Sequence, residues 1–451
     1  MNDVARRRMS PAPVKEAEPD LLEKLSIAGP PVPPDTAPRS RPARSGTFGV
    51  LDVGSTKVCC MIGRTDPDGT MRVIGSAMRA SRGVRAGGIV DLDAASQAIA
   101  GVVGEAEDKA GQRIEHYLVN LSCGQPESRL YTVEWPVGGR AVTEHDLRRV
   151  VQEGGRRALI TGREIIHVVP LMFSVDETQG VSDPRRMHCD QLRAKLHVID
   201  AAASAVHNLI ATIGRCKLQL EELVSAPLAS GLATLVEDER QLGTTVIDMG
   251  GGTTGMAVFS EGQLLHTAHL RIGGLHITKD IAQGLSTPLA QAERLKTLYG
   301  SAQPSPDDER EMLPISLVGE EEHDVHKIPR SKVISIIVPR LEETFEMVRA
   351  QLDAAGIARE AGHRVVLTGG ASQMPGLRDM ATRILGGQVR LGKPAHLRGL
   401  PDFATGPAFA TASGLLAWAS GSGRHLADVK LEEDGPPTLL ARIVKYIGDR
   451  L

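Results

Sequence analysis

The sequence predicts an α/β fold built from two similar halves, with a small α+β module inserted into the first half. Two segments indicate the duplication: FGVLDVGSTKV (Phe48–Val58) and TTVIDMGGGTT (Thr244–Thr254). Each is an apolar, β-branched run ending in Asp, followed by one apolar residue and then Gly with small hydroxyl residues. Such a run predicts a buried strand followed by a tight turn. The aspartates, Asp52 and Asp248, lie 196 positions apart, which leaves room for a domain-sized half between the repeats.

The first half is expected in two pieces. Residues 47–113 predict two strands joined by the first Gly turn, a third strand over 71–76 and a helix over about 93–110. Residues 193–238 return to a strand followed by a helix. We therefore assign both pieces to the first half.

Residues 114–192 separate these pieces and have a different pattern. Thr143 suits the N-cap of a single helix, and Asp146 suits its first turn. Apolar runs predict strands over 115–121, 130–135 and 165–173. We interpret 114–192 as the inserted α+β module.

The second half is expected to cover residues 239–391. After the repeated turn and a strand pair, two glycines open a helix over 273–285. A charged stretch, 304–327, is expected to be mobile and to precede a long helix over 331–355. The segment VVLTGGASQMPGL (Val365–Leu377) predicts a strand, a Gly-Gly turn and a helix.

Residues 392–420 are expected to return to the first half. The segment 403–423 carries no charge, but it consists largely of Gly, Ala, Ser and Thr and contains Pro407. This composition is too weakly apolar for a membrane span, so we expect a buried helix.

The two ends of the chain differ from its middle. Residues 1–46 hold nine of the 27 prolines and no aromatic residue, which predicts a disordered arm. Residues 421–437 predict a polar linker, and 438–451 predict an amphipathic helix. Its apolar face consists of Leu440, Ile443, Val444, Ile447 and Leu451. Such a face with basic flanks suits an anionic membrane surface, although the pattern alone fits a helix docked on the protein's own body equally well.

The composition argues against some classes of function. The net charge of −3, the pI of about 6.5 and the aromatic content of 3% offer neither a basic surface nor stacking platforms, so we expect no nucleic-acid partner. The five cysteines form no C-x-x-C pair, which predicts buried free thiols in a reducing cytosol. No secretory signal is expected.

The chemistry of the two Gly turns suits a nucleotide phosphate and magnesium. Glycines let backbone N–H groups approach an anion, and Asp52 and Asp248, at the strand ends, can hold Mg²⁺ through water. No G-x-x-x-x-G-K-[ST] motif occurs, so the site is not a P-loop. The expected phosphate-binding residues are Gly54, Ser55, Thr56 and Lys57 in the first turn and Gly250, Gly251, Gly252 and Thr253 in the second.

A second group of residues suits the ribose and base. Gly369, Gly370 and Ser372 are small enough for a flat ring to lie against the backbone at a helix start. Glu293 and Lys296 are three positions apart, hence on one helix face, and can reach a ribose. From the pattern alone, a solvated ion pair between these two is the better interpretation.

The order of these motifs resembles the actin-like ATPase superfamily and, more closely, its FtsA family of bacterial cell-division proteins. The resemblance runs from Phe48 to the C-terminus. It rests on DVGSTKV, SRGVRAGGIVDLD (Ser81–Asp93), HVVPLMFSVDETQGVSDP (His167–Pro184), DMGGGTT, GGLHITKDIA, AERLKTLYG (Ala292–Gly300) and VLTGGAS. The Ser81 and His167 blocks are the more particular to FtsA-like chains. The resemblance implies a two-lobed, ribonuclease H-like duplicated ATPase fold whose small inserted subdomain serves head-to-tail polymer contacts.

The resemblance also implies an ATP site. It assigns the two turns and both aspartates to the phosphates and Mg²⁺. Residues expected beside the ribose and base are Gly273, Gly274, Glu293, Lys296, Gly369, Gly370 and Ser372. Hydrolytic relatives carry a Glu before the Pro of an E-P-x-A-A run, whereas here Ala226 precedes Pro227. Alanine cannot orient or deprotonate water, so we expect a nucleotide-binding switch with at most weak ATPase activity.

The resemblance further implies partners and a location. In this family the C-terminal tail of FtsZ docks on the subdomain with the long helix, where PRLEE (Pro339–Glu343) matches a P-R-x-x-E element. Arg340 is the first candidate and Glu343 the second, against a surface Arg paired with its own helix. The family also implies a peripheral protein on the cytoplasmic face of the bacterial inner membrane, at the division septum. There it binds anionic lipids, self-assembles and recruits later division proteins.

Two other functions fit the same fold: a small-molecule kinase and a pilus-assembly ATPase. A kinase needs a carboxylate base beside a substrate pocket, and Ala226 and the small insertion argue against one. The Ser81 and His167 blocks and the terminal helix favour cell division over pilus assembly.

Overall fold

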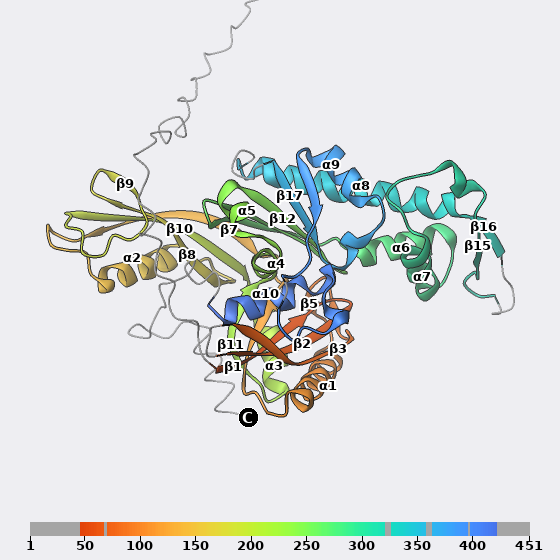
Figure 1. Cartoon of the computed structure of the whole chain (residues 1–451), viewed down its shortest axis with the longest axis horizontal. Helices are drawn as coiled ribbons and strands as arrows, with labels where there is room; N and C mark the ends of the chain where they lie inside the picture. The colour runs from red at the N-terminus through yellow and green to blue at the C-terminus, as the bar shows by residue number, and fades with distance from the viewer. Residues whose placement is uncertain (1–45, 67–69, 321–325, 358–362, 396, 422–451) are drawn as a thin grey trace, which may run out of the picture. The chain divides into compact units, whose positions relative to one another are not determined.

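Residues 46–66, 70–320, 326–357, 363–395 and 397–421 are described by the computed structural model, and all belong to one compact unit of the chain. The predicted N-terminal arm up to residue 45 lies outside the described residues, as do the predicted linker and terminal helix beyond residue 421. Two five-stranded sheets and one four-stranded sheet carry the described fold (Figure 1).

The first five-stranded sheet lies in the first half of the chain. Its strands are β1 (Gly46–Val53), β2 (Lys57–Thr65), β3 (Met71–Ala80), β6 (His116–Leu121) and β11 (Gln219–Ser225). The order is β11-β6-β1-β2-β3, in which β1, β2 and β3 are antiparallel and β1, β6 and β11 are parallel. A two-stranded hairpin, β4 (Val84–Arg85) and β5 (Gly88–Ile89), follows β3.

Two helices share a core with this sheet: α1 (Leu92–Ala110) and α3 (Ala203–Arg215). The α1 helix begins where Asp91 accepts hydrogen bonds from the backbone N–H groups of Asp93 and Ala94, both at 3.0 Å. It ends at Gly111, which adopts the left-handed conformation of a C-cap.

The second five-stranded sheet repeats the first. Its strands are β12 (Thr244–Met249), β13 (Thr254–Ser260), β14 (Gln263–Leu270), β17 (Arg364–Thr368) and β18 (Gln388–Leu391). The order β14-β13-β12-β17-β18 has the same alternation of antiparallel and parallel neighbours, with β12 in the place of β1. The duplication that the repeated motif predicts is therefore present in the sheets.

The inserted module forms the four-stranded antiparallel sheet β7-β10-β8-β9, with α2 packed on it. Its elements are β7 (Glu127–Pro136), α2 (Glu144–Arg157), β8 (Arg163–Val175), β9 (Thr178–Val181) and β10 (Gln191–Ala202). As expected, Thr143 is the N-cap of α2 and forms a capping box with Asp146.

The bounds of this sheet differ from the predicted module at 114–192. β6 pairs with β1 in the first sheet, and β10 runs on to Ala202 in the inserted sheet. An apolar run predicts that a strand exists but does not identify its partners, so both ends of the module were misplaced from the sequence.

Helices and a small hairpin complete the second half. They are α5 (Glu237–Leu242), α6 (Gly274–Leu285), α7 (Leu289–Tyr299), η2 (Pro306–Glu309), β15 (Met312–Ile315), β16 (His326–Pro329), α8 (Arg330–Ala354), η3 (Gly370–Gln373) and α9 (Leu377–Leu385). The described part of 304–327, predicted from its charge to be a mobile stretch, contains η2, β15 and the first residues of β16. Leu313, Ile315 and Ile328 are buried in the core of the second half, and β15 pairs with β16.

Two helices, α4 (Ala226–Thr234) and α10 (Ala410–Ala419), pack against each other in a core that also contains residues of both five-stranded sheets. A Cβ atom on Gly414 would lie 1.7 Å from the Ala229 carbonyl oxygen, so the two helices meet closely at this glycine. The short helices η4 (Asp402–Ala404) and η5 (Pro407–Phe409) precede α10. The buried helix predicted for 403–423 is present, and among the described residues no helix has the length and apolarity needed to cross a membrane.

Candidate functional site

The two repeated aspartates occupy equivalent positions in the two sheets. Asp52, near the end of β1, pairs with Cys59 on β2. Asp248, near the end of β12, pairs with Gly255 on β13. Because both strands are central in equivalent sheets, each carboxylate is placed by the same local structure.

The turns that follow the aspartates close in the same way. The Gly54 N–H donates to the Lys57 carbonyl oxygen at 3.0 Å, and the Gly250 N–H donates to the Thr253 carbonyl oxygen at 2.9 Å. The repeat in the sequence is thus a repeat in hydrogen bonding.

The two turns touch each other. A Cβ atom on Gly251 would lie 2.3 Å from Cγ2 of Thr56, and one on Gly252 would lie 2.3 Å from Oγ of Ser55. Real Cβ atoms do not approach this closely, so glycine is required at both positions for the contact. Ser55 is also held from the other side, where its Oγ accepts from the Gly87 N–H at 2.9 Å.

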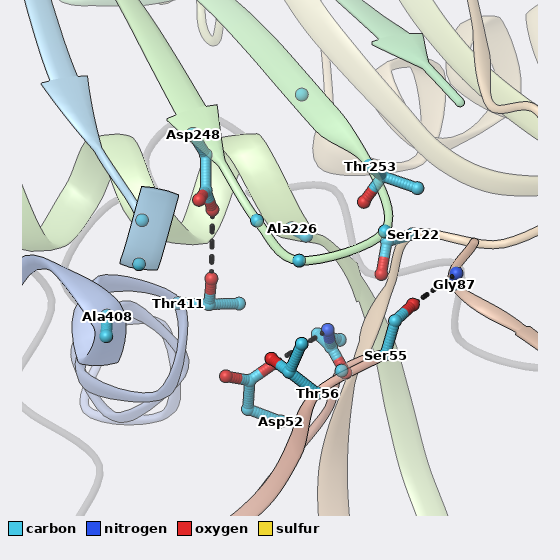
Figure 2. A pocket seen from close by; sticks show the side chains of 18 of the residues that line it. Asp52, Ser55, Thr56, Gly87, Ser122, Ala226, Asp248, Thr253, Ala408 and Thr411 are labelled. Carbon is cyan, nitrogen blue, oxygen red and sulfur yellow. Dashed lines mark hydrogen bonds between the residues drawn. The ribbon is translucent and has the colours of Figure 1, made fainter. Parts of the chain in front are cut away.

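A cavity of about 830 Å³, including space open to solvent, lies at this contact (Figure 2). The sequence-predicted residues that line it are Asp52, Gly54, Ser55, Thr56, Lys57, Asp248, Gly250, Gly251, Gly252, Thr253, Gly369 and Gly370. Figure 2 shows Asp52 and Asp248 on different walls, with Thr411 of α10 between them.

Asp52 has its charge compensated. Its Oδ1 accepts from Nδ2 of Asn120 at 2.9 Å, and its Oδ2 pairs with Nζ of Lys57 at 3.3 Å. The Lys57 ammonium also lies 4.6 Å from the ring centroid of Phe409. Burial alone lowers the pKa of Lys57, but the Asp52 carboxylate offsets this effect, and the resulting pKa lies above its usual value. Lys57 therefore stays charged at neutral pH.

Asp248 has hydroxyl partners instead. Its Oδ2 accepts from Oγ of Ser230 at 2.5 Å and from Oγ1 of Thr411 at 3.0 Å. Burial of the carboxylate raises its pKa, and the charge of Asp52 adds to this, while the two hydroxyls act in the opposite direction. A nearby cation would stabilise the charged form of this buried carboxylate.

These residues fit a magnesium–triphosphate ligand. The glycine turns leave a cradle that a Cβ would fill, and the two carboxylates are oxygen ligands of the kind Mg²⁺ prefers. The described part of the chain contains no group of three or more His, Cys, Asp or Glu side chains that could hold a metal ion. Phosphate oxygens and water would therefore supply the remaining ligands.

Gly369 lies directly against the carboxylate of Asp248. Its φ is +84°, a conformation that favours glycine, and a Cβ there would lie 2.3 Å from Oδ1 of Asp248. Ser372, which the sequence assigned to the ligand, does not line the cavity. It is buried, and its hydroxyl donates to the Gly369 carbonyl oxygen at 2.8 Å, so it supports the turn from behind.

Four further predicted residues lie next to the second turn without lining the cavity: Gly273, Gly274, Glu293 and Lys296. The Gly274 N–H donates to the Gly250 carbonyl oxygen at 3.0 Å. Nζ of Lys296 donates to the Gly274 carbonyl oxygen at 3.1 Å and pairs with Glu293 at 2.7 Å. Lys296 therefore links α7 to the start of α6. The sequence indicated its ion pair with Glu293 but not its hydrogen bond to Gly274.

Several cavity residues were missed from the sequence: Gly87, Asn120, Ser122, His269, Ala408 and Thr411. Of these, Asn120 carried a usable signal, since it is a polar residue inside the apolar run YLVNL of β6. Its amide links Asp52 to the backbone, accepting from the Val53 N–H at 2.7 Å. Ala226, at the start of α4, lines the cavity.

The predicted partner-binding residues lie on α8, outside the cavity lining. Arg340 pairs with Asp280 of α6, with an Nε–Oδ2 distance of 2.5 Å, and its Nη1 lies 2.5 Å from Oε2 of Glu343. About 29% of the Arg340 side chain is exposed, so one edge of this cluster reaches the surface.

Curated cell-division proteins named FtsA resemble the chain over most of its length. The protein from Rhizobium meliloti strain 1021 is 43% identical over 84% of this chain and 89% of its own. Those of Pseudomonas aeruginosa and Escherichia coli K12 are 32% and 31% identical, each over 82% of this chain and 88% and 90% of their own. The chain belongs to the FtsA family of cell-division proteins. The FtsA family model matches residues 245–414, and the model of the SHS2 domain inserted in FtsA matches 124–200.

The FtsA assignment also explains the third sheet, because the SHS2 match covers most of it. Among solved structures, the PilM–PilN type IV pilus biogenesis complex is 18% identical, with a TM-score of 0.59 over 84% of this chain and 99% of that chain. At this identity the likeness concerns the fold. The predicted actin-like, two-lobed α/β fold with an inserted small subdomain is confirmed.

Proposed function

We propose that this FtsA-family protein binds ATP with Mg²⁺ in the cavity between its two Gly turns. The observation that supports this proposal is the direct contact between the turns, where Gly251 meets Thr56 and Gly252 meets Ser55. Each turn is preceded by an aspartate that also lines the cavity. Backbone N–H groups from both turns then face the same anion, while Lys57 contributes a fixed positive charge. When bound, the metal supplies charge neutralisation at the phosphates.

Hydrolysis is proposed to be very slow. The cavity wall at the start of α4 is formed by Ala226 and Pro227, neither of which has a side chain able to orient or deprotonate water. Positioning carries most of the catalysis of phosphoryl transfer. A site with two metal-binding carboxylates and no acidic side chain at the start of α4 to position the attacking water acts as a binding switch.

The biological role proposed is that of an assembly scaffold for cell division. The protein self-assembles on the cytoplasmic face of the inner membrane at the septum, anchors FtsZ filaments by their C-terminal tails, and recruits later division proteins. Family membership supports this role, and the Arg340–Glu343 cluster on α8 is the proposed tail-binding surface. The terminal segment 438–451 is the proposed lipid anchor.

Calorimetry with the full chain, Mg²⁺ and ATP tests the nucleotide proposal. We expect binding by the native protein and its loss in Asp248→Ala. Asp353→Ala is the matched control, because Asp353 is an exposed aspartate near the end of α8. No heat of association with the native protein overturns the proposal. A steady ATPase rate comparable to a chaperone's, abolished in Asp248→Ala, overturns the slow-hydrolysis part alone.

A further inference from the structure

His269 is a cavity residue whose hydrogen-bonding groups are unused. It lies near the end of β14, opposite Gly255 of β13, and its side chain lines the cavity. Neither ring nitrogen has a hydrogen-bond partner among the described residues, and both are covered by protein atoms. Leaving a covered polar group without a partner costs free energy, so such a group in a binding cavity points to a partner that arrives with the ligand.

The cavity wall beside His269 is made of small and apolar residues. Gly255, directly opposite in the strand pair, has no side chain, and a Cβ there would meet Cγ of Pro227 at 3.1 Å. Ala226 and Pro227 form the adjoining wall. They begin α4, a nine-residue helix with no acidic residue in its first turn, so the positive end of its dipole lies at the same wall.

This wall lies on the phosphate side of the cavity. Gly255 follows directly on the second Gly turn, through Thr254, whereas the proposed base-side residues Gly369 and Gly370 belong to the turn after β17. A triphosphate seated on the Gly turns with its base toward Gly369 therefore directs its terminal phosphate away from that turn.

We propose that His269 recognises the terminal phosphate of the bound nucleotide and makes the site prefer a triphosphate to a diphosphate. The proposal rests on the nucleotide binding proposed above and adds the residue that reads the nucleotide state. Rotation of the side chain turns a ring N–H toward the cavity, where it donates to a γ-phosphate oxygen. Hydrogen bonds to charged acceptors are stronger than those between neutral groups.

The ring acts as a neutral donor. Burial lowers the pKa of His269 to about 4, so the imidazole carries no charge between pH 6 and pH 8. The Lys57 ammonium at the same cavity keeps its charge over this range, because the Asp52 carboxylate outweighs the effect of burial on the pKa of Lys57.

The test compares dissociation constants for Mg²⁺–ATP and Mg²⁺–ADP in the full chain, by calorimetry at pH 7.5. We expect His269→Ala to weaken ATP binding about tenfold, equivalent to about 1.4 kcal/mol, and to leave ADP binding within about twofold of native. His269→Gln, which keeps a side-chain N–H, should retain most of the preference. His145→Ala is the control, because His145 is an exposed histidine on α2.

The possible failures are distinct. If the native protein binds neither nucleotide, the proposed function itself is overturned. If the native protein binds both and His269→Ala keeps the native ratio of ATP to ADP affinity, only the role of His269 is overturned. An equal loss of both affinities in His269→Ala and His269→Gln, with native thermal unfolding, also rejects it, because a terminal-phosphate contact is absent in ADP.

Discussion

Gly251 and Thr56 come from opposite halves of the chain, yet a Cβ atom on Gly251 would lie 2.3 Å from Cγ2 of Thr56. The contact joins the second Gly turn to the first at the lip of the cavity. The absence of a single methyl group thus sets how closely the two turns approach. In the proposed nucleotide site, this distance determines whether one phosphate group can contact both turns.

Gly251→Ala should weaken nucleotide binding about tenfold, because the added methyl group separates the turns at an overpacking cost of about 1–3 kcal/mol. Thr56→Ser removes Cγ2, so the double variant should recover most of the loss. Gly104→Ala on α1 is the control, since a Cβ there meets nothing within 4 Å. Calorimetry measures the effect. Native affinity in Gly251→Ala would contradict the proposed closeness of the turns.

Asp248→Asn should stabilise the nucleotide-free protein while abolishing Mg²⁺-dependent nucleotide binding. The folded-state pKa of Asp248 is raised above its unfolded value. The stability that its protonated form contributes is present at low pH and is lost as pH rises through the folded-state pKa. At pH 7.5 the carboxylate is a charge without an ion-pair partner among the described residues, and Asn removes that charge while its amide oxygen can still accept from Ser230 and Thr411.

Thermal unfolding between pH 5 and pH 8 without nucleotide measures this effect. We expect a gain of about 0.5–2 kcal/mol at pH 7.5 that shrinks as the pH falls through the raised folded-state pKa of Asp248. Asp353→Asn, at an exposed site, should change nothing. A loss of stability at pH 7.5 in Asp248→Asn would show that the charged carboxylate does not destabilise the nucleotide-free protein.

Arg340→Ala should abolish binding of an FtsZ C-terminal tail peptide while leaving thermal unfolding nearly native. Arg340 is held by Asp280 and Glu343, which leave its guanidinium oriented at the surface. Asp280→Asn weakens one competing pair and should tighten peptide binding a few-fold. Removing an interface Arg typically costs about 2 kcal/mol or more.

Fluorescence anisotropy with a labelled tail peptide measures this binding. Arg383→Ala is the control, because Arg383 of α9 pairs with Glu342 of the same α8 helix and is 62% exposed. Equal affinities in Arg340→Ala and Arg383→Ala would assign Arg340 a structural role only.

Deleting residues 437–451 should give a protein that no longer sediments with anionic vesicles. The apolar face of this segment has basic residues beside it, which suits an anionic surface. Asp substitutions of Ile443 and Ile447 in the full chain should have the same effect, and Asp449→Asn should not. Sedimentation that survives both the deletion and the Asp substitutions would show that the lipid contact lies elsewhere.

The parts of the site that could be predicted are those encoded in short contiguous motifs. Asp52 and Asp248 with their Gly turns are visible because an apolar run, a carboxylate and glycines occur in one fixed order twice. A strand followed by this turn leaves little conformational choice, so the local structure follows from the residues. The same holds for Thr143 and Asp146, whose capping box begins α2.

The remaining parts depend on contacts between distant segments. Ser230 and Thr411 reach Asp248 from α4 and α10, but in the sequence each is a small polar residue in an apolar helix. His269 is likewise one of two histidines in a strand, and only the pairing with Gly255 places it at the cavity. For the same reason the partners of β6 and β10 were not predictable, because apolar periodicity does not specify which strand lies alongside.

The alanine at the start of α4 has a consequence for what determines which nucleotide occupies the site. In an enzyme that cleaves its nucleotide, the hydrolysis rate sets how long ATP stays bound, and each molecule passes from the ATP-bound to the ADP-bound state in a fixed order. With Ala226 at this wall, and cleavage as slow as proposed, occupancy instead follows the ratio of free ATP to free ADP around the protein. Such a scaffold would respond to the energy charge of the cell and would reset by exchange.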